Sequence, residues 1–146
     1  MKQKIFSAGD SWTGLLTRVA LGLLILPHGL QKAFGLFGGY GFTGTMGYFT
    51  EFIKIPWLLG AFIIFTELVG SFLLIAGLAV RCWSVIIIAI MIGTIVTVHG
   101  ANGFFMDWGG ILKGEGYEYH LAIIFLALVL IMNGAGRFSL DKRIAV

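Results

Sequence analysis

Charged residues are scarce in this sequence, and their scarcity argues against a soluble globular domain. Only 12% of the 146 residues are Asp, Glu, Lys or Arg, whereas soluble domains carry about 25%. Hydrophobic residues make up 58% of the chain, and its mean hydropathy is +0.96. The sequence therefore predicts a membrane-embedded protein, and its length leaves room for one domain.

Cysteine is almost absent, since Cys82 is the one cysteine in the chain. This excludes an intrachain disulfide and a CxxC redox pair, so thiol chemistry would need a partner protein. The sequence also lacks a P-loop, a GxSxG motif and a dinucleotide fingerprint after a strand. The net charge of +3 comes from residues at the ends of apolar segments rather than from a patch, so nucleic-acid binding is not expected.

Long apolar runs predict an all-α fold, an integral membrane four-helix bundle. The runs are continuous and rich in Leu, Ile, Val and Ala, unlike the alternating pattern of membrane β-strands. We expect a single transmembrane domain over residues 1–146, with outer loops at about 35–55 and 100–118. The expected spans lie at about 12–34, 56–78, 82–99 and 119–137.

The basic residues predict that both termini are cytoplasmic, because cytoplasmic ends carry an excess of Lys and Arg. The smaller group lies at the outer side and consists of Lys32, Lys54 and Lys113. The larger group lies at the side of the termini and consists of Lys2, Lys4, Arg18, Arg81, Arg137, Lys142 and Arg143.

The two halves of the chain show signs of an internal repeat. A shift of 71 residues gives six identities in the 18 positions from 22 to 39, and it aligns His28 with His99 and Gly29 with Gly100. Glycine-rich composition inflates such matches. If the repeat holds, each half is a two-span hairpin and both His-Gly corners lie near the outer face.

Glu67 is the most informative single residue, because it is the one ionisable group in the apolar segment 56–78. A charge at mid-depth costs about 2.5–3.5 kcal/mol on insertion scales, so such a residue faces the bundle interior and is usually functional. Arg18 and Lys32 on the first span are candidate counter-ions, and His28 is a candidate hydrogen-bond partner. The alternative is a protonated or Arg-paired carboxyl that only holds helices together.

Three histidines, His28, His99 and His120, gather toward the outer side of the predicted bundle. They fit a polar cluster that binds a quinone or small polar substrate. They also fit a metal or haem site, because imidazoles suit Zn, Cu and Fe. In the third interpretation each histidine only caps a helix or binds a loop carbonyl. No HxxxH or ExxH pair is present, so the spacing does not choose between them.

Short polar and glycine motifs at the span ends carry a family resemblance. In chain order they are Arg18-x-x-x-Gly22, His28-Gly29-x-x-Lys32, Glu67-x-x-Gly70 leading to Gly77, Arg81, His99 and Gly134-x-Gly136-Arg137-Phe-Ser-Leu-Asp141. With these motifs the chain resembles the DoxX family of small four-span bacterial membrane proteins, from about Thr17 to Asp141. The resemblance implies a multi-pass protein of the bacterial cytoplasmic membrane tied to redox biology. Some relatives are described as subunits of thiosulfate:quinone oxidoreductase, and many have no assigned activity.

The sequence thus favours a small subunit or accessory protein of a membrane redox complex over a stand-alone enzyme. In this hypothesis Glu67 exchanges protons, and His28, Lys32, His99 and Arg18 bind a quinone or small substrate. Other membrane subunits or further copies of the chain are the expected partners, besides the lipid bilayer. The alternatives are a structural subunit without chemistry and a small-molecule transporter. A cavity surrounded by these side chains would favour a binding site, and a Glu67 sealed by Arg18 would favour a scaffold.

Overall fold

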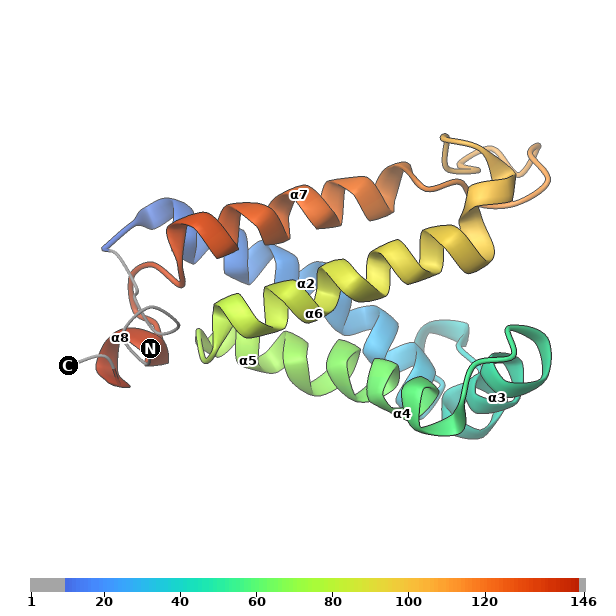
Figure 1. The fold of residues 1–146 in the computed structure, drawn as a ribbon, viewed down its shortest axis with the longest axis horizontal. Coiled ribbons are helices and arrows are strands. Elements are labelled where there is room, and N and C mark those ends of the chain that lie inside the picture. The colour runs from blue at the N-terminus through green and yellow to red at the C-terminus, as the bar shows by residue number, and fades with distance from the viewer. Residues whose placement is uncertain (1–9, 145–146) are drawn as a thin grey trace.

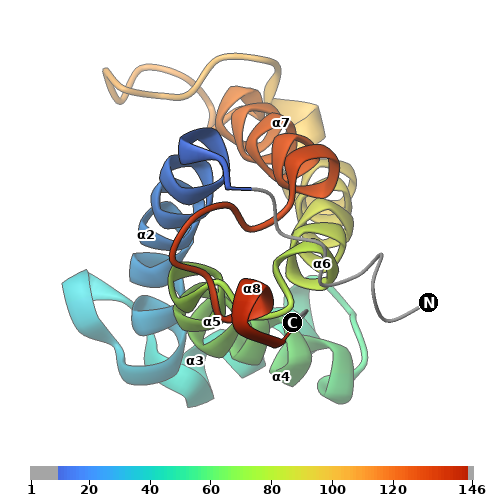
Figure 2. The ribbon, with the colours of Figure 1, turned by 90° about the vertical axis from the view of Figure 1, so that its left-hand side faces the viewer.

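The protein is an all-helical bundle in the computed structural model, which describes residues 10–144 and contains no strand in that range. Four helical columns surround one core (Figures 1 and 2), so the predicted fold class is confirmed. Lys2 and Lys4 lie outside the described residues. The columns are α2 (Trp12–Phe34); α4 (Trp57–Phe65) continued by η3 (Thr66–Gly70) and α5 (Ser71–Ala76); α6 (Val80–Thr94) continued by η4 (Ile95–His99) and η5 (Gly100–Asn102); and α7 (Glu118–Asn133).

Three of the columns are long and apolar enough to cross a membrane. They cover 23, 20 and 23 residues, at Trp12–Phe34, Trp57–Ala76 and Val80–Asn102, and about 20 helical residues span the roughly 30 Å hydrocarbon core. The fourth helix, α7, has 16 residues. It ends at Asn133, short of the predicted end at residue 137, because Gly134 turns the chain with a φ of 75°.

The connecting segments gather at the two ends of the bundle. The end away from α8, named the outer end after the expected orientation, holds η1 (Leu36–Gly38), α3 (Gly41–Gly47), η2 (Tyr48–Phe52) and the loop 103–117. At the other end α8 (Leu140–Ile144) lies near the start of α2 (Figure 1). Acidic side chains fold the loop 103–117: Asp107 Oδ1 accepts from the N–H groups of Ile111 and Leu112 at 2.8 and 3.0 Å.

The core lies between all four columns and is apolar. Large apolar side chains are also exposed all round the bundle, as at Leu58 and Val96, which suits an outer surface in contact with lipid tails. The buried core cluster consists of Leu21, Ile25, Leu74, Val80, Ile87, Met91, Ile123, Ala127, Leu130 and Ala135.

Two glycines let α2 pack closely against the second column. A Cβ on Gly29 would lie 2.6 Å from the backbone of Glu67 and Leu68, and a Cβ on Gly22 would lie 2.6 Å from Ile75 Cγ1. Small residues allow this kind of approach between membrane helices. The Gly29 contact holds the backbone of Glu67 directly against the helix that carries His28 and Lys32.

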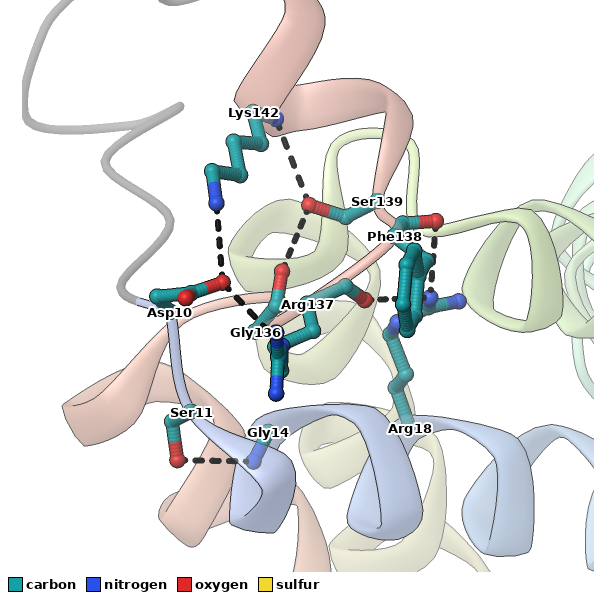
Figure 3. Close-up of polar contacts among 9 residues, drawn as sticks. All are labelled: Asp10, Ser11, Gly14, Arg18, Gly136, Arg137, Phe138, Ser139 and Lys142. Carbon is teal, nitrogen blue, oxygen red and sulfur yellow. Dashed lines mark hydrogen bonds and ion pairs between the residues drawn. The ribbon is translucent and has the colours of Figure 1, made fainter.

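Arg18 holds the other end of the bundle together (Figure 3). Arg18 is only 2% exposed, and its guanidinium has five N–H donors. Those donors point to five backbone carbonyls, of Leu74, Ile75, Ala135, Arg137 and Phe138. Arg18 therefore joins α2 to the end of α5 and to the segment that follows α7.

Asp141 caps the start of α6 from the C-terminal end of the chain. Its two carboxylate oxygens accept from the N–H groups of Ala79 and Val80, at 2.6 and 3.0 Å. These groups have no partner within their own helix. In the same segment a Cβ on Gly136 would lie 2.5 Å from the backbone of Ser11 and Leu15. The run from Gly134 to Asp141 therefore has a structural role, because it closes this end of the bundle.

Candidate functional site

A cavity of about 500 Å³ lies inside the outer half of the bundle. Ligand-binding cavities typically measure about 300–1,000 Å³. Its walls come from α2, η2, η3, α6, η4, the loop 103–117 and α7. Five of the residues selected from the sequence line it, namely His28, Lys32, Glu67, His99 and His120.

Lys32 and Glu67 form an ion pair in the cavity wall. Lys32 Nζ lies 2.6 Å from Glu67 Oε2, and the two side chains are 26% and 8% exposed. Lys32 was one of the two candidate counter-ions, and it is the one that contacts Glu67. Charge-assisted hydrogen bonds of this kind are among the strongest in proteins, and removing one partner leaves the other buried and uncompensated.

Two π-helical turns carry key side chains into the cavity. Glu67 belongs to η3 and His99 to η4, and π-helical turns inside α-helices are frequent at functional sites. Ser71 Oγ donates to the carbonyl of Glu67 at 2.5 Å and so takes up a carbonyl of this irregular turn. The widened turns aim side chains that a regular α-helix would direct elsewhere.

His99 and His120 lie ring against ring, with centroids 4.3 Å apart. His99 Nδ1 donates to the carbonyl of Glu115 at 2.7 Å, and because a carbonyl only accepts, Nδ1 carries the proton. In the neutral form of the ring, His99 Nε2 is then the acceptor. His120 is buried, and within the described residues its Nδ1 has no hydrogen-bond partner. Buried polar atoms nearly always have one, so this nitrogen is an exception, and it lies in a ring that packs against His99 in the cavity wall.

Tyr119 is a cavity residue that sequence reasoning did not select. Its hydroxyl lies 3.3 Å from the carbonyl oxygen of Leu24 and 3.5 Å from His28 Nε2. It therefore connects α7 to α2 beside His28. A tyrosine at the start of a span is usual in the aromatic belt of a membrane protein, and its position next to His120 was the one signal that could have found it.

Arg18 lies apart from this cavity. Arg18 and Lys32 are separated along α2 by about 21 Å, at a rise of 1.5 Å per residue. All five carbonyl partners of Arg18 belong to the opposite end of the bundle. Glu67 is therefore not sealed by Arg18. His28, His99 and His120 surround the cavity, but the described residues contain no group of three His, Cys, Asp or Glu side chains placed to hold a metal ion.

Comparisons with known proteins agree with this architecture. The family model described as DoxX matches residues 14–100, a range that includes Lys32, Glu67 and His99. The Bacillus subtilis (strain 168) protein named "Putative oxidoreductase CatD" is 36% identical over 127 residues, which cover 87% of this chain and 83% of the relative. No solved structure matches the chain. The matched range and this level of identity show that the chain belongs to the DoxX family.

Proposed function

We propose that this protein is a small subunit or accessory protein of a membrane redox complex and that its outer cavity binds a quinone. The observation that carries the proposal is the convergence of Lys32, Glu67, His28, His99 and His120 on one cavity beside an apolar core. Polar and ionisable side chains at membrane depth are costly and usually mark a functional site. The name of the relative supports a link to redox chemistry.

The cavity offers what a quinone ring requires. A quinone is a flat neutral ring with two carbonyl oxygens that accept hydrogen bonds. Lys32 Nζ is a donor at one wall, and His120, which also lines the cavity, carries one N–H donor in either of its neutral tautomers. The imidazole rings and the phenol of Tyr119 supply flat surfaces for stacking.

Reduction of a quinone to its quinol consumes two electrons and two protons. The electrons come from a redox partner protein, and the protons pass through groups that line the cavity. Glu67 is the proton-exchanging group in this proposal, because its ion pair with Lys32 places a proton acceptor beside a proton donor. Tyr119 and His28 continue the chain of exchangeable groups on the other side.

Ligand binding tests the site directly. We would titrate menadione, a naphthoquinone ring without a tail, into the purified protein and measure its affinity by calorimetry. Lys32→Gln should weaken binding about 10-fold or more, since a hydrogen bond to a charged group contributes about 1.5–3 kcal/mol. The matched control is Lys113→Gln, an exposed lysine at the same end of the bundle.

Glu67→Gln separates proton exchange from binding. Because Gln keeps the shape and a hydrogen-bonding oxygen, the variant should fold, yet turnover of the intact redox complex should be lost. Glu51→Gln, at an exposed carboxylate outside this cavity, is the control. Normal turnover with Glu67→Gln would remove Glu67 from the mechanism, and equal menadione affinity in Lys32→Gln and wild type would remove the quinone site.

The proposal also places the protein in the bacterial cytoplasmic membrane with both termini on the cytoplasmic side. By their elements, the described basic residues at the end that holds α8 are Arg18, Arg81, Arg137, Lys142 and Arg143, and those at the outer end are Lys32, Lys54 and Lys113. This distribution follows the excess of positive charge on the cytoplasmic side. A reporter enzyme that works only in the cytoplasm should be active when it is fused to the C-terminus. Purification from native membranes in mild detergent, with mass spectrometry, should recover other redox subunits.

A further inference from the structure

A second space of about 420 Å³ opens between α4 and α6. It adjoins the outer cavity, because Phe49, Thr94 and Val98 line both spaces. The cleft therefore lies between the apolar outer surface of the bundle and the chamber that contains the Lys32–Glu67 pair, and it shares part of its wall with that chamber.

The walls of the cleft are apolar along their length. The side chains from α4 include Leu59, Phe62 and Ile63. The threonines of the opposite wall do not present free hydroxyls, because Thr94 and Thr97 each donate to a carbonyl of their own helical column at 2.8 Å. A ligand in the cleft would meet hydrocarbon, so the cleft suits an aliphatic chain.

Small residues keep the cleft open. Ala89 and Gly93 lie on the exposed face of α6 toward α4, and a Cβ added to Gly93 would have nothing within 4 Å. The column of α4 and α5 lies close to α6 at the turn between α5 and α6. From there the column and α6 diverge toward the outer end, where α4 lies (Figure 1). A small-residue face would also suit helix association, but this face adjoins a cavity that charged and polar side chains line.

We infer that the cleft between α4 and α6 holds the isoprenoid tail of a membrane quinone whose ring lies in the outer cavity. The inference rests on the proposed function and names the ligand more closely: an amphiphile with a neutral polar ring and a long aliphatic tail. The ring enters sideways from the bilayer, past Phe49, and the tail remains between the helices in contact with lipid.

Charge distinguishes this occupant from a phospholipid. The chamber at the end of the cleft already contains one cation and one carboxylate in contact, Lys32 and Glu67. A neutral head leaves that pair intact, whereas a phosphate head would bring a negative charge beside the buried carboxylate of Glu67 and compete for its lysine. A quinone ring accepts hydrogen bonds without adding charge.

The test compares two ligands that share a ring and differ in the tail. Menadione has no tail, and phylloquinone carries a phytyl chain on the same ring. Binding of both to the full chain in nanodiscs of one lipid composition is measured for wild type, Ala89→Phe, Gly93→Phe and Ala122→Phe. The last is the matched control, because Ala122 is exposed on α7 and lies outside both spaces. Thermal unfolding of each variant verifies that it is folded.

Filling the cleft should lower phylloquinone affinity about 10-fold or more in Ala89→Phe and Gly93→Phe, while menadione affinity changes by less than about 2-fold. Ala122→Phe should change neither. Unchanged phylloquinone affinity in both cleft variants would overturn the inference and leave the quinone site standing. Tightly bound phospholipid lost from the cleft variants, or a dimer that dissociates in them, would overturn it in favour of those occupants. If menadione does not bind wild type, the proposed function fails and this inference with it.

Discussion

Replacing Gly29 with Ala should separate Lys32 from Glu67. The added Cβ would lie 2.6 Å from the carbonyl carbon of Glu67 and from the amide nitrogen of Leu68. These are backbone atoms, which cannot rotate out of the way as the end of a side chain can. Since non-bonded carbon atoms pack at about 3.5–4.0 Å, α2 and η3 must move apart by about 1 Å.

Two opposing effects set the change in stability. Overpacking a tight contact costs about 1–3 kcal/mol, and the higher helix propensity of Ala over Gly returns up to about 1 kcal/mol. The net loss should be about 0–3 kcal/mol. The ion pair should suffer more, because the 2.6 Å separation of Lys32 Nζ and Glu67 Oε2 would approach the roughly 3.5 Å at which a hydrogen bond is no longer made.

The assay measures thermal unfolding in detergent together with menadione affinity. Gly29→Ala should lose affinity by a larger factor than its modest change in unfolding temperature suggests. Gly93→Ala is the matched control for stability, because a Cβ there has open space within 4 Å, and it should be as stable as wild type or more stable. If Gly29→Ala binds menadione as wild type does and unfolds at the same temperature, the close contact of α2 with η3 is not what holds Glu67 in place.

Three further predictions concern the opposite end of the bundle. Arg18→Lys leaves at least two of the buried carbonyls without a donor, and each unsatisfied carbonyl costs about 1–3 kcal/mol. The free energy of unfolding, measured by denaturant titration, should therefore fall by about 2–6 kcal/mol. The menadione affinity of the folded fraction should stay unchanged. Asp141→Ala removes the cap of α6 and should cost about 0.5–2 kcal/mol in the same assay. The hydrogen bond from Lys142 lowers the pKa of Asp10 in the folded protein below its usual 3.8. The contribution of ionised Asp10 to stability is therefore present above pH 3.8 and is lost as the pH falls through the lower pKa of the folded state. Asp10→Asn should therefore reduce the acid dependence of the melting temperature and, since the pair is exposed, change it little at neutral pH.

The helical extent of the first predicted span could be read from the sequence because its signals are local. The first was expected at 12–34, and α2 covers those residues. Ser11 caps its start, where its side chain accepts from the N–H of Gly14 at 3.3 Å, and Gly35 ends it in the left-handed conformation. The π-helical turns η3 and η4 could not be predicted in this way, because they arise from packing between columns, as where the backbone of η3 meets Gly29.

The polar layer of the site was also within reach of the sequence, because position along a helix gives depth in the membrane. His28, Lys32, His99 and His120 were expected at the outer side, and they line one cavity. Depth does not give the direction in which a side chain points or the identity of its partner. For this reason Arg18 was a candidate for the site. Its partners are backbone carbonyls, and a sequence does not show which carbonyls a side chain will reach.

The contrast between Arg18 and Lys32 shows how one helix separates stability from binding. Both are cations on the same face of α2, which is long and apolar enough to cross a membrane. The donors of Arg18 are all directed at backbone carbonyls, so this side chain has none left for a ligand. Lys32 has three donors, is 26% exposed in the cavity wall and pairs with one carboxylate. It is therefore the cation with donors left for a ligand, and a ligand that binds it lies beside Glu67 without disturbing the end of the bundle that Arg18 holds closed.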